Sequence, residues 1–461
     1  MILIAGVAGL LETLEKADGI LDRVQNSLED YLEKKRMAFP RFYFLSNDEL
    51  LEILAQTRDP KAVQPHMGKC FDAIRSLDFG GGEGRPETKD FRIYGMISPE
   101  GEIVDYNPNT KARGSVEAWL TGIEMEMRAS LKLLMKAAVM DYLNKPREVW
   151  LNDHVCQVVL TVASVLWARE VLDAFASENT AALMKENVER SKSQLYELTL
   201  LVRGDLSKLQ RKIVSTLIVL DVHARDTLEL FCAEEIFDES DFSWQMQLRF
   251  YWDEDVDNCI VRQTNAHFKY GYEYLGAQMR LVITGMTDRC YMTLSGALHL
   301  KLGGAPAGPA GTGKTETTKD LSKGLGIQCV VFNCGDNLDI HFMAGFFKGL
   351  CQCGAWACFD EFNRINIEVL SVVAQQMISI QNALRAIPDG TTNSTFSFEG
   401  KEIKIFETFG AFITMNPGYA GRTELPDNLK VLFRPVSMMI PNYTMVAEVM
   451  LFSEGERKHA L

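Results

Sequence analysis

The sequence predicts a protein of mixed α and α/β class, with a mostly helical region over residues 1–240 and an α/β domain over residues 241–461. Two observations predict this division. In the first region, apolar residues recur every three or four positions, which is the spacing of one helix face. In the second region, short apolar runs end in polar or glycine-rich turns, as strands of a central parallel sheet do where ligands bind.

The first region carries several stripes of Leu, Met and aromatic residues at helical spacing. Ser46 and Glu49 have the spacing of a capping box, so a helix is expected to begin there, and Pro40 is expected to close the helix before it. We interpret the stripes as helix-packing core, and none of them suggests chemistry. They are Leu21, Val24, Leu28, Tyr31 and Leu32; Val116, Trp119, Leu120, Ile123, Met127, Leu131 and Leu134; and Leu206, Leu209, Ile213 and Leu217.

Two further features mark the organisation of the chain. Residues 80–87 are rich in glycine and are expected to form an exposed loop between two short strands. The part of the chain that is rich in strands is expected to start within residues 244–252 and to continue to the end.

A glycine-rich run fits the pattern G-x-x-x-x-G-K-[S/T] of phosphate-binding loops. Glycine lets successive backbone N–H groups turn inward and form an anion site. A strand over residues 300–305 and a helix over residues 316–325 are expected to flank the loop. The alternative is a flexible linker that matches by chance. The predicted nucleotide-binding residues of this run are Gly308, Pro309, Ala310, Gly311, Thr312, Gly313, Lys314, Thr315 and Glu316.

Chemistry gives individual residues of the run distinct roles. The charge of Lys314 is expected to act on the β- and γ-phosphates, and the Thr315 hydroxyl to bind Mg²⁺. A second apolar run, residues 355–359, ends in two acids. Asp360 is expected to hold the Mg²⁺ shell and Glu361 to activate the attacking water as general base. The alternative is a strand that ends in a solvated acidic turn.

A third apolar run, residues 409–415, precedes Asn416. In AAA+ ATPases a polar residue at this place orients the lytic water, so Asn416 is a third predicted catalytic residue beside Lys314 and Glu361. The alternative is an asparagine that starts a turn before Pro417 and Gly418. Three strand ends on one edge of a parallel sheet favour the P-loop AAA+ interpretation.

Several stretches together resemble the first AAA+ module of dynein heavy chains, and others resemble the dynein linker, the mechanical element that precedes this module. The linker sequence, especially residues 45–49, is more similar to axonemal heavy chains than to the cytoplasmic one. The module stretches are residues 281–284, 287–291, 303–318, 329–334, 358–365 and 413–430, and the linker stretches are residues 39–51, 97–102 and 221–226.

The resemblance implies a base-binding segment, Leu281, Val282, Ile283 and Thr284, which would cup the adenine ring. The alternative for these residues is plain core. Gly285 follows where the family usually has proline. Arg434 matches the place of an arginine finger that acts on a neighbouring module, or is an ordinary ion-pairing arginine. Arg422 and Arg364 are candidates for sensing the nucleotide.

The resemblance also implies the function: an ATP- and Mg²⁺-dependent motor module that couples nucleotide state to linker movement for minus-end-directed motility and ciliary beating. Expected partners are other dynein heavy, intermediate and light chains, with microtubules bound only through regions outside this chain. The expected location is the cytoplasm and cytoskeleton, in the axoneme of a cilium. The chain is expected to lack the helical lid. The alternatives are a fragment that binds nucleotide or subunits with weak catalysis, and a remodelling AAA+ ATPase.

Composition excludes several other classes of function. The net charge of −14 argues against nucleic acid as a partner. The ten cysteines have no zinc-site spacing, which indicates a reduced, intracellular chain. Residues 1–11 have the length of a signal-peptide core but lack a basic start. No apolar run approaches the ~20 residues that a bilayer span requires.

Overall fold

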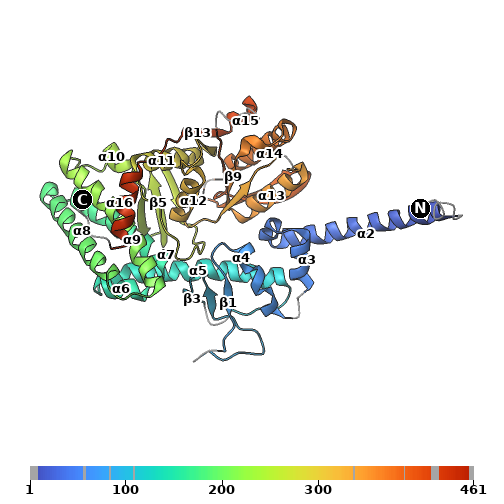
Figure 1. Ribbon diagram of the computed structural model, residues 1–461, viewed down its shortest axis with the longest axis horizontal. Helices are drawn as coiled ribbons and strands as arrows, with labels where there is room; N and C mark the ends of the chain where they lie inside the picture. Colours follow the sequence, from blue (N-terminus) through green and yellow to red (C-terminus); the bar gives the residue numbers. More distant parts are fainter. Residues whose placement is uncertain are drawn as a thin grey trace.

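The computed structural model describes residues 9–55, 59–81, 85–106, 110–335, 338–388, 390–416 and 425–455. Figure 1 shows one long helix, α2 (Leu10–Ala38), extending away from a body in which helices surround a central sheet. The apolar residues 1–8 lie outside the described part of the chain. Among the residues that the structure describes, no helix combines the length and hydrophobicity of a membrane span.

The N-terminal half is mostly helical, as predicted. It also contains a small antiparallel sheet in the order β1-β2-β3. The predicted loop, residues 80–87, falls between β1 and β2 in the sequence, and its residues 82–84 lie outside the described part of the chain. The elements are α2, the 3₁₀ helix Pro40–Phe44, α3 (Asn47–Ala55), the 3₁₀ helix Pro60–His66, α4 (Met67–Cys70), β1 (Ser76–Asp78), β2 (Gly95–Ile97), β3 (Ile103–Asp105), α5 (Val116–Tyr142), α6 (Arg147–Asp153), α7 (Cys156–Phe175), α8 (Thr180–Val202), α9 (Lys208–Ala233) and α10 (Phe242–Gln245).

The capping box of α3 and the apolar stripe of α5 are confirmed. The N–H of Glu49 donates to Ser46 Oγ at 3.3 Å, and the N–H of Ser46 donates to Glu49 Oε2 at 3.0 Å, which completes the predicted capping box of α3. The stripe of α5 is buried except for Leu134, which is partly buried against the same core. Ile213 and Leu217 of α9 are buried too.

The stripe assigned to α2 is a wrong prediction. Leu21, Val24, Leu28 and Tyr31 are exposed, Leu21 by 65%, and only Leu32 is buried at 1%. The helix is amphipathic in sequence, but most of it lies beside no other described element (Figure 1). Periodicity shows which residues share a helix face, and the path of the chain decides whether that face is covered.

The strand-rich part begins within the predicted range 244–252, because its first strand starts at Arg249, and residues 242–245 before it form the short helix α10. Asp241 caps this short helix by accepting from the N–H of Ser243. An antiparallel sheet in the order β4-β5-β6 follows, built from β4 (Arg249–Asp253), β5 (Asn258–Gln263) and β6 (Ala266–Lys269).

A five-stranded sheet carries the nucleotide motifs, and its strands run in the order β13-β7-β12-β9-β8, all parallel. The strand before the glycine-rich run begins at Gly303 rather than at residue 300, because α11 continues to His299. The elements are α11 (Gly285–His299), β7 (Gly303–Ala307), α12 (Lys314–Leu325), β8 (Cys329–Asn333), α13 (Ile340–Cys353), β9 (Trp356–Asp360), the 3₁₀ helix Phe362–Arg364, α14 (Ile367–Arg385), the hairpin β10 (Asn393–Phe398) and β11 (Lys401–Phe406), β12 (Gly410–Ile413), α15 (Asp427–Lys430), β13 (Phe433–Ser437) and α16 (Tyr443–Ser453).

Successive side chains of β9 enter different cores, as the pleat of a strand requires. Ala357 and Phe359 pack with α13 and α14, whereas Trp356 and Cys358 join the core that contains α11 and α12. The core that contains Trp356 and Cys358 also contains residues of the N-terminal helices, among them Phe42. The proposed domain boundary near residue 240 therefore lies within a shared core.

Candidate nucleotide site

The glycine-rich loop lies between β7 and α12, at the carboxyl edge of the parallel sheet. Gly311 and Gly313 have φ values of +79°, a region that favours glycine. Gly308 is required for a different reason, because a Cβ there would lie 2.3 Å from the carbonyl oxygen of Met438. Its N–H donates to the carbonyl of Met415 at 3.2 Å, which ties the loop to the end of β12.

Lys314 begins α12 and is buried. Its Nζ donates to the carbonyl oxygens of Gly308, at 3.0 Å, and Pro309, at 2.7 Å, so the ammonium group folds back over its own loop. Thr312 Oγ1 also donates to the Pro309 carbonyl, at 2.9 Å. The charge predicted to act on phosphate thus lies at the loop whose backbone would cradle it.

Thr315 and Asp360, the two residues predicted to hold Mg²⁺, are in contact. Thr315 Oγ1 donates to Asp360 Oδ1 at 2.8 Å, which joins the first turn of α12 to the end of β9. Thr414 Oγ1 donates to the same carboxylate oxygen and accepts from the Glu361 N–H at 3.1 Å. Thr414 had no predicted role, because a threonine at the end of an apolar strand gives no motif.

Glu361 directly follows β9 in a left-handed conformation, with φ of +53°. This turn brings both of its carboxylate oxygens into contact with other polar residues. Asn416 Nδ2 donates to Oε1 at 3.1 Å, and Arg364 Nη2 lies 2.5 Å from Oε2. The predicted general base, the predicted water-orienting residue and one of the candidate sensors are therefore neighbours.

Asn416 is buried, and one of its two polar side-chain atoms makes no hydrogen bond to the described residues. Its Oδ1 has no hydrogen-bond partner among the residues that the structure describes. A buried amide oxygen without a donor is costly to keep, so such atoms call for an explanation. The turn predicted at Pro417 and Gly418, and Arg422, fall outside the described residues.

The segment predicted to contact adenine is partly buried and is anchored to the phosphate-loop helix. Asp320 of α12 accepts from the backbone N–H of Leu281 at 2.9 Å. It also accepts three bonds from Arg280, at 3.0 and 3.1 Å from Nε and at 3.0 Å from Nη2, and one from Tyr291 Oη at 2.5 Å. Thr284 caps α11 by accepting from the Thr287 N–H. The segment is thereby held beside the helix that begins at Lys314.

Buried charge makes this anchor strong. Burial raises the pKa of Asp320, but the charge of Arg280 and the hydrogen bonds from Arg280, Tyr291 and the Leu281 N–H together hold that pKa below its usual value. Burial lowers the pKa of Arg280, but the attraction of Asp320 and Tyr291 and the hydrogen bonds to both together raise it above its usual value. No motif predicted this pair, since the two residues are 40 positions apart.

Two further predicted residues, Glu316 and Arg434, are exposed. Glu316 is exposed on the first turn of α12 and pairs with Lys319 at 3.0 Å. Arg434 is exposed on the edge strand β13, where it is paired in register with Gly304. It has no ion-pair partner within the described ranges. Among the residues that the structure describes, all ten cysteines are free, and no group of three His, Cys, Asp or Glu residues could hold a metal ion.

Comparison with known proteins places both halves of the chain in one family. Residues 270–460 match a family described as the hydrolytic ATP binding site of the dynein motor region. Residues 2–138 match the family described as dynein heavy chain, N-terminal region 2.

Similar proteins include three axonemal heavy chains. The human dynein axonemal heavy chain 6 is 56% identical over 467 residues, covering 97% of this chain and 11% of that protein. The mouse dynein axonemal heavy chains 2 and 1 are 51% and 52% identical, again over 97% of this chain and 10% of theirs. The chain thus spans about a tenth of the length of these relatives.

Proposed function

Since this chain belongs to the dynein heavy chain family, we propose that its α/β half binds and hydrolyses ATP as the first motor module of an axonemal dynein. The observation that carries the proposal is the convergence of Thr315, Asp360, Glu361 and Asn416 at one edge of the sheet. The sequence matches show the family, whereas the proximity of these side chains supports ATP hydrolysis at this site.

The phosphate loop supplies the binding site. Its backbone N–H groups and Lys314 would hold the β- and γ-phosphates, and residues 281–284 would contact the base. The oxygens of Thr315 and Asp360 lie within hydrogen-bond distance of each other. They are hard oxygen ligands of the kind that Mg²⁺ prefers. They would hold the ion that neutralises charge on the phosphates.

Glu361 and Asn416 would carry the hydrolytic step. Asn416 Oδ1, which has no partner among the described residues, can accept a hydrogen bond from water, and this would orient that water beside Glu361. The water oxygen attacks the γ-phosphorus, the bond from that phosphorus to the β,γ-bridging oxygen breaks, and the water proton passes to Glu361. ADP and inorganic phosphate are the products.

The helical half would act as part of the linker. We assign residues 1–240 to the linker region and residues 241–461 to the ATPase module, and their shared core would transmit movement between them. In the axoneme of a cilium, such movement would drive minus-end-directed motility together with other dynein heavy, intermediate and light chains. Microtubules would be bound by other parts of the motor. This assignment is favoured over a remodelling AAA+ ATPase because residues 2–138 match a dynein-specific region.

Equilibrium binding of a fluorescent ATP analogue with Mg²⁺ tests the proposal. The chain should bind the analogue, Lys314→Ala should lose binding, and Lys319→Ala should bind as the unaltered chain does. Lys319 is a suitable control because it lies on the same helix and pairs with exposed Glu316. The proposal is overturned if the unaltered chain does not bind, or if Lys314→Ala binds equally well.

Turnover by the isolated chain should be slow. An arginine finger from a neighbouring module can contribute ~10³-fold or more to such reactions. We therefore expect a rate well below the ~1–100 s⁻¹ of competent phosphoryl-transfer enzymes. Release of inorganic phosphate under single-turnover conditions measures it.

A further inference from the structure

The residues from 270 to 284, called here the connecting segment, join β6 to α11 without forming a helix or strand. Its start is bonded to the end of the phosphate-loop helix. The Gly271 N–H donates to the Leu325 carbonyl at 2.9 Å, and the Glu273 N–H donates to the Gly326 carbonyl at 2.8 Å. The approach is close, because a Cβ at Gly271 would lie 2.5 Å from the Gly326 oxygen.

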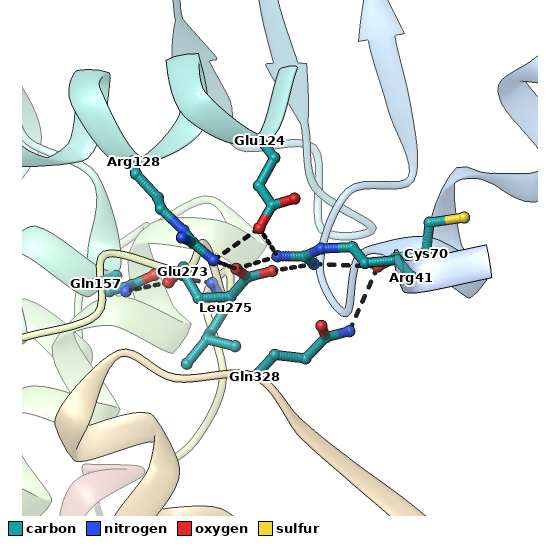
Figure 2. A network of polar contacts seen from close by, with 8 residues as sticks. All are labelled: Arg41, Cys70, Glu124, Arg128, Gln157, Glu273, Leu275 and Gln328. Atoms are coloured by element: carbon teal, nitrogen blue, oxygen red, sulfur yellow. Dashed lines mark hydrogen bonds and ion pairs between the residues drawn. The ribbon is translucent and has the colours of Figure 1, made fainter. Parts of the chain in front are cut away.

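An arginine from the helical half forms an ion pair with a residue of this segment (Figure 2). Arg41, in the 3₁₀ helix after α2, places Nη1 2.7 Å from Glu273 Oε1 and Nη2 2.7 Å from Glu273 Oε2. The side chains are 1% and 3% exposed. A two-pronged contact between planar groups fixes orientation as well as distance, so the pair holds Glu273 in one place.

Further residues of the helical half surround the same point. Arg41 Nη2 also lies 3.1 Å from Glu124 Oε1 of α5, and Arg128 reaches that oxygen at 2.7 Å. Burial alone raises the pKa of Glu124, but the charges of Arg41 and Arg128 hold it below its usual value. The network therefore contains two arginines and two carboxylates, so that each cation has at least one anion within ion-pair distance.

Gln157 of α7 grips the backbone of the connecting segment from another side. Its Nε2 donates to the Glu273 carbonyl at 2.7 Å, and its Oε1 accepts from the Leu275 N–H at 2.8 Å. Figure 2 shows Gln157 and Arg41 approaching Glu273 from opposite directions. The segment is thus held by two separate elements of the helical half.

The other end of the connecting segment is held by the nucleotide site. Arg280 and the Leu281 N–H are bonded to Asp320, which lies on the helix that begins at Lys314. The residues predicted to contact the base follow at once. We call the ion pair of Arg41 with Glu273 the clamp. One continuous segment therefore runs from the clamp to the residues predicted to bind the base.

Buried ion pairs contribute little net stability compared with apolar residues of similar size, and their best-attested value is in specifying one arrangement. This points to a positional role for the clamp. We propose that Arg41 and Glu273 are positioning residues for the nucleotide base, which set the location of residues 281–284 and so the affinity for adenine. The inference rests on the proposed function, because it requires ATP at this site.

The position of the helical half and base affinity are then coupled in both directions. A movement of the 3₁₀ helix that carries Arg41 weakens the grip on adenine, and bound adenine in turn resists that movement, because such coupling is reciprocal. The bonds from Gly271 and Glu273 reach only the carboxyl end of α12. The phosphate loop lies at the other end of that helix and is held by separate bonds, from the Gly308 N–H to the Met415 carbonyl and from the Met438 N–H to the Ala307 carbonyl, so phosphate binding is expected not to depend on Arg41 and Glu273.

The double variant Arg41→Met, Glu273→Leu tests this inference. It removes both charges of the clamp and leaves Glu124 paired with Arg128 at 2.7 Å, so no buried charge loses its only partner. Apolar replacement of a buried pair is often neutral or stabilising. Calorimetric titration of the full chain with Mg-ATP and with Mg-tripolyphosphate separates base binding from phosphate binding.

The double variant should bind Mg-ATP about 5 to 150 times more weakly, the usual range of coupling between sites. Its affinity for Mg-tripolyphosphate should be unchanged. The control is Asp257→Asn, which breaks an exposed ion pair of 2.7 Å with Lys136 of α5 and leaves the connecting segment alone. The control should bind both ligands normally.

Different results overturn different statements. Normal Mg-ATP affinity in the double variant overturns the positioning role and leaves the ATPase assignment intact. An equal loss for both ligands overturns it too, because the damage then extends beyond the base. If the unaltered chain binds neither ligand, the proposed function fails and this inference falls with it.

Discussion

Asn416 and Glu361 are 55 positions apart in the sequence, yet Asn416 Nδ2 donates a 3.1 Å hydrogen bond to Glu361 Oε1. The two residues follow neighbouring parallel strands, β12 and β9, which bring Ile413 into register with Phe359. The sheet thereby places an amide and a carboxylate where one water could contact both.

Replacing Glu361 by Gln should slow hydrolysis and leave ATP binding intact. The amide keeps the size of the side chain and can still accept from Asn416, but it is no longer a base. General base catalysis typically contributes about 10² to 10⁴ in rate. Single-turnover phosphate release, with binding measured in parallel, gives both quantities. Glu368→Gln, an exposed acid nearby, should leave both unchanged. Normal hydrolysis by the Glu361→Gln variant would remove Glu361 from the mechanism.

Replacing Asn416 by Ala should slow hydrolysis through Glu361 rather than independently of it. The variant loses the donor that orients Oε1 and the acceptor that would orient water. Residues that act as a unit give effects that do not add. The loss in the Glu361→Gln, Asn416→Ala double variant should therefore be far smaller than the product of the two single losses. Rates that multiply would show that the two residues act separately.

Replacing Asp320 by Asn should destabilise the fold. The variant leaves Arg280 buried without its carboxylate partner, and removing one member of a buried pair typically costs about 3–5 kcal/mol. Urea unfolding at neutral pH measures the difference in the free energy of unfolding. Glu316→Gln, at an exposed site on the same helix, should change it by less than about 0.5 kcal/mol. Unchanged stability of the Asp320→Asn variant would mean that Arg280 finds another partner.

The difference in stability between the Asp320→Asn variant and the unaltered chain should become smaller at acidic pH. Asp320 has a lowered pKa in the folded protein, so it binds protons less readily there than in the unfolded chain. Its stabilisation is complete above the ordinary aspartate pKa of about 4 and disappears as the pH falls through the folded pKa. The gap in urea midpoint between the two proteins should narrow below about pH 4. A gap that stays constant would exclude Asp320 titration as its source.

Replacing Gly285 by Pro should stabilise the protein. Gly285 is the first residue of α11, where proline is well accepted. Thr284 before it has φ −116° and ψ 165°, the extended conformation that a residue preceding proline prefers. No atom lies within 4 Å of a Cβ at this position. A gain of about 0.4–1 kcal/mol is expected from the stiffer unfolded chain.

A matched control lies in the same helix. Gly296 has equally open space around its Cβ position, but it is in the interior of α11. Proline there removes a helical hydrogen bond and should cost about 3 kcal/mol or more. Thermal unfolding of both variants checks the pair. If Gly285→Pro also destabilises, the start of α11 is more constrained than its dihedral angles indicate.

Local patterns determined much of this protein. The phosphate loop, the acids after β9, the asparagine after β12 and the Ser46–Glu49 capping box could all be predicted, because each depends on residues close together in the chain. The strand that enters the loop was misplaced by a few residues, since Leu300 is apolar but follows α11 and is exposed. Hydropathy does not distinguish such a residue from the start of a buried strand.

The tertiary structure alone decided the contacts between distant residues. Arg41 and Glu273 are 232 positions apart, and no spacing rule connects an arginine after one helix with a glutamate in an irregular segment. The stripe of α2 shows the same limit from the other side, because its periodicity is correct and most of it is exposed. Local sequence sets backbone conformation and the direction of each side chain, whereas burial and charge pairing depend on which distant segments the fold brings together.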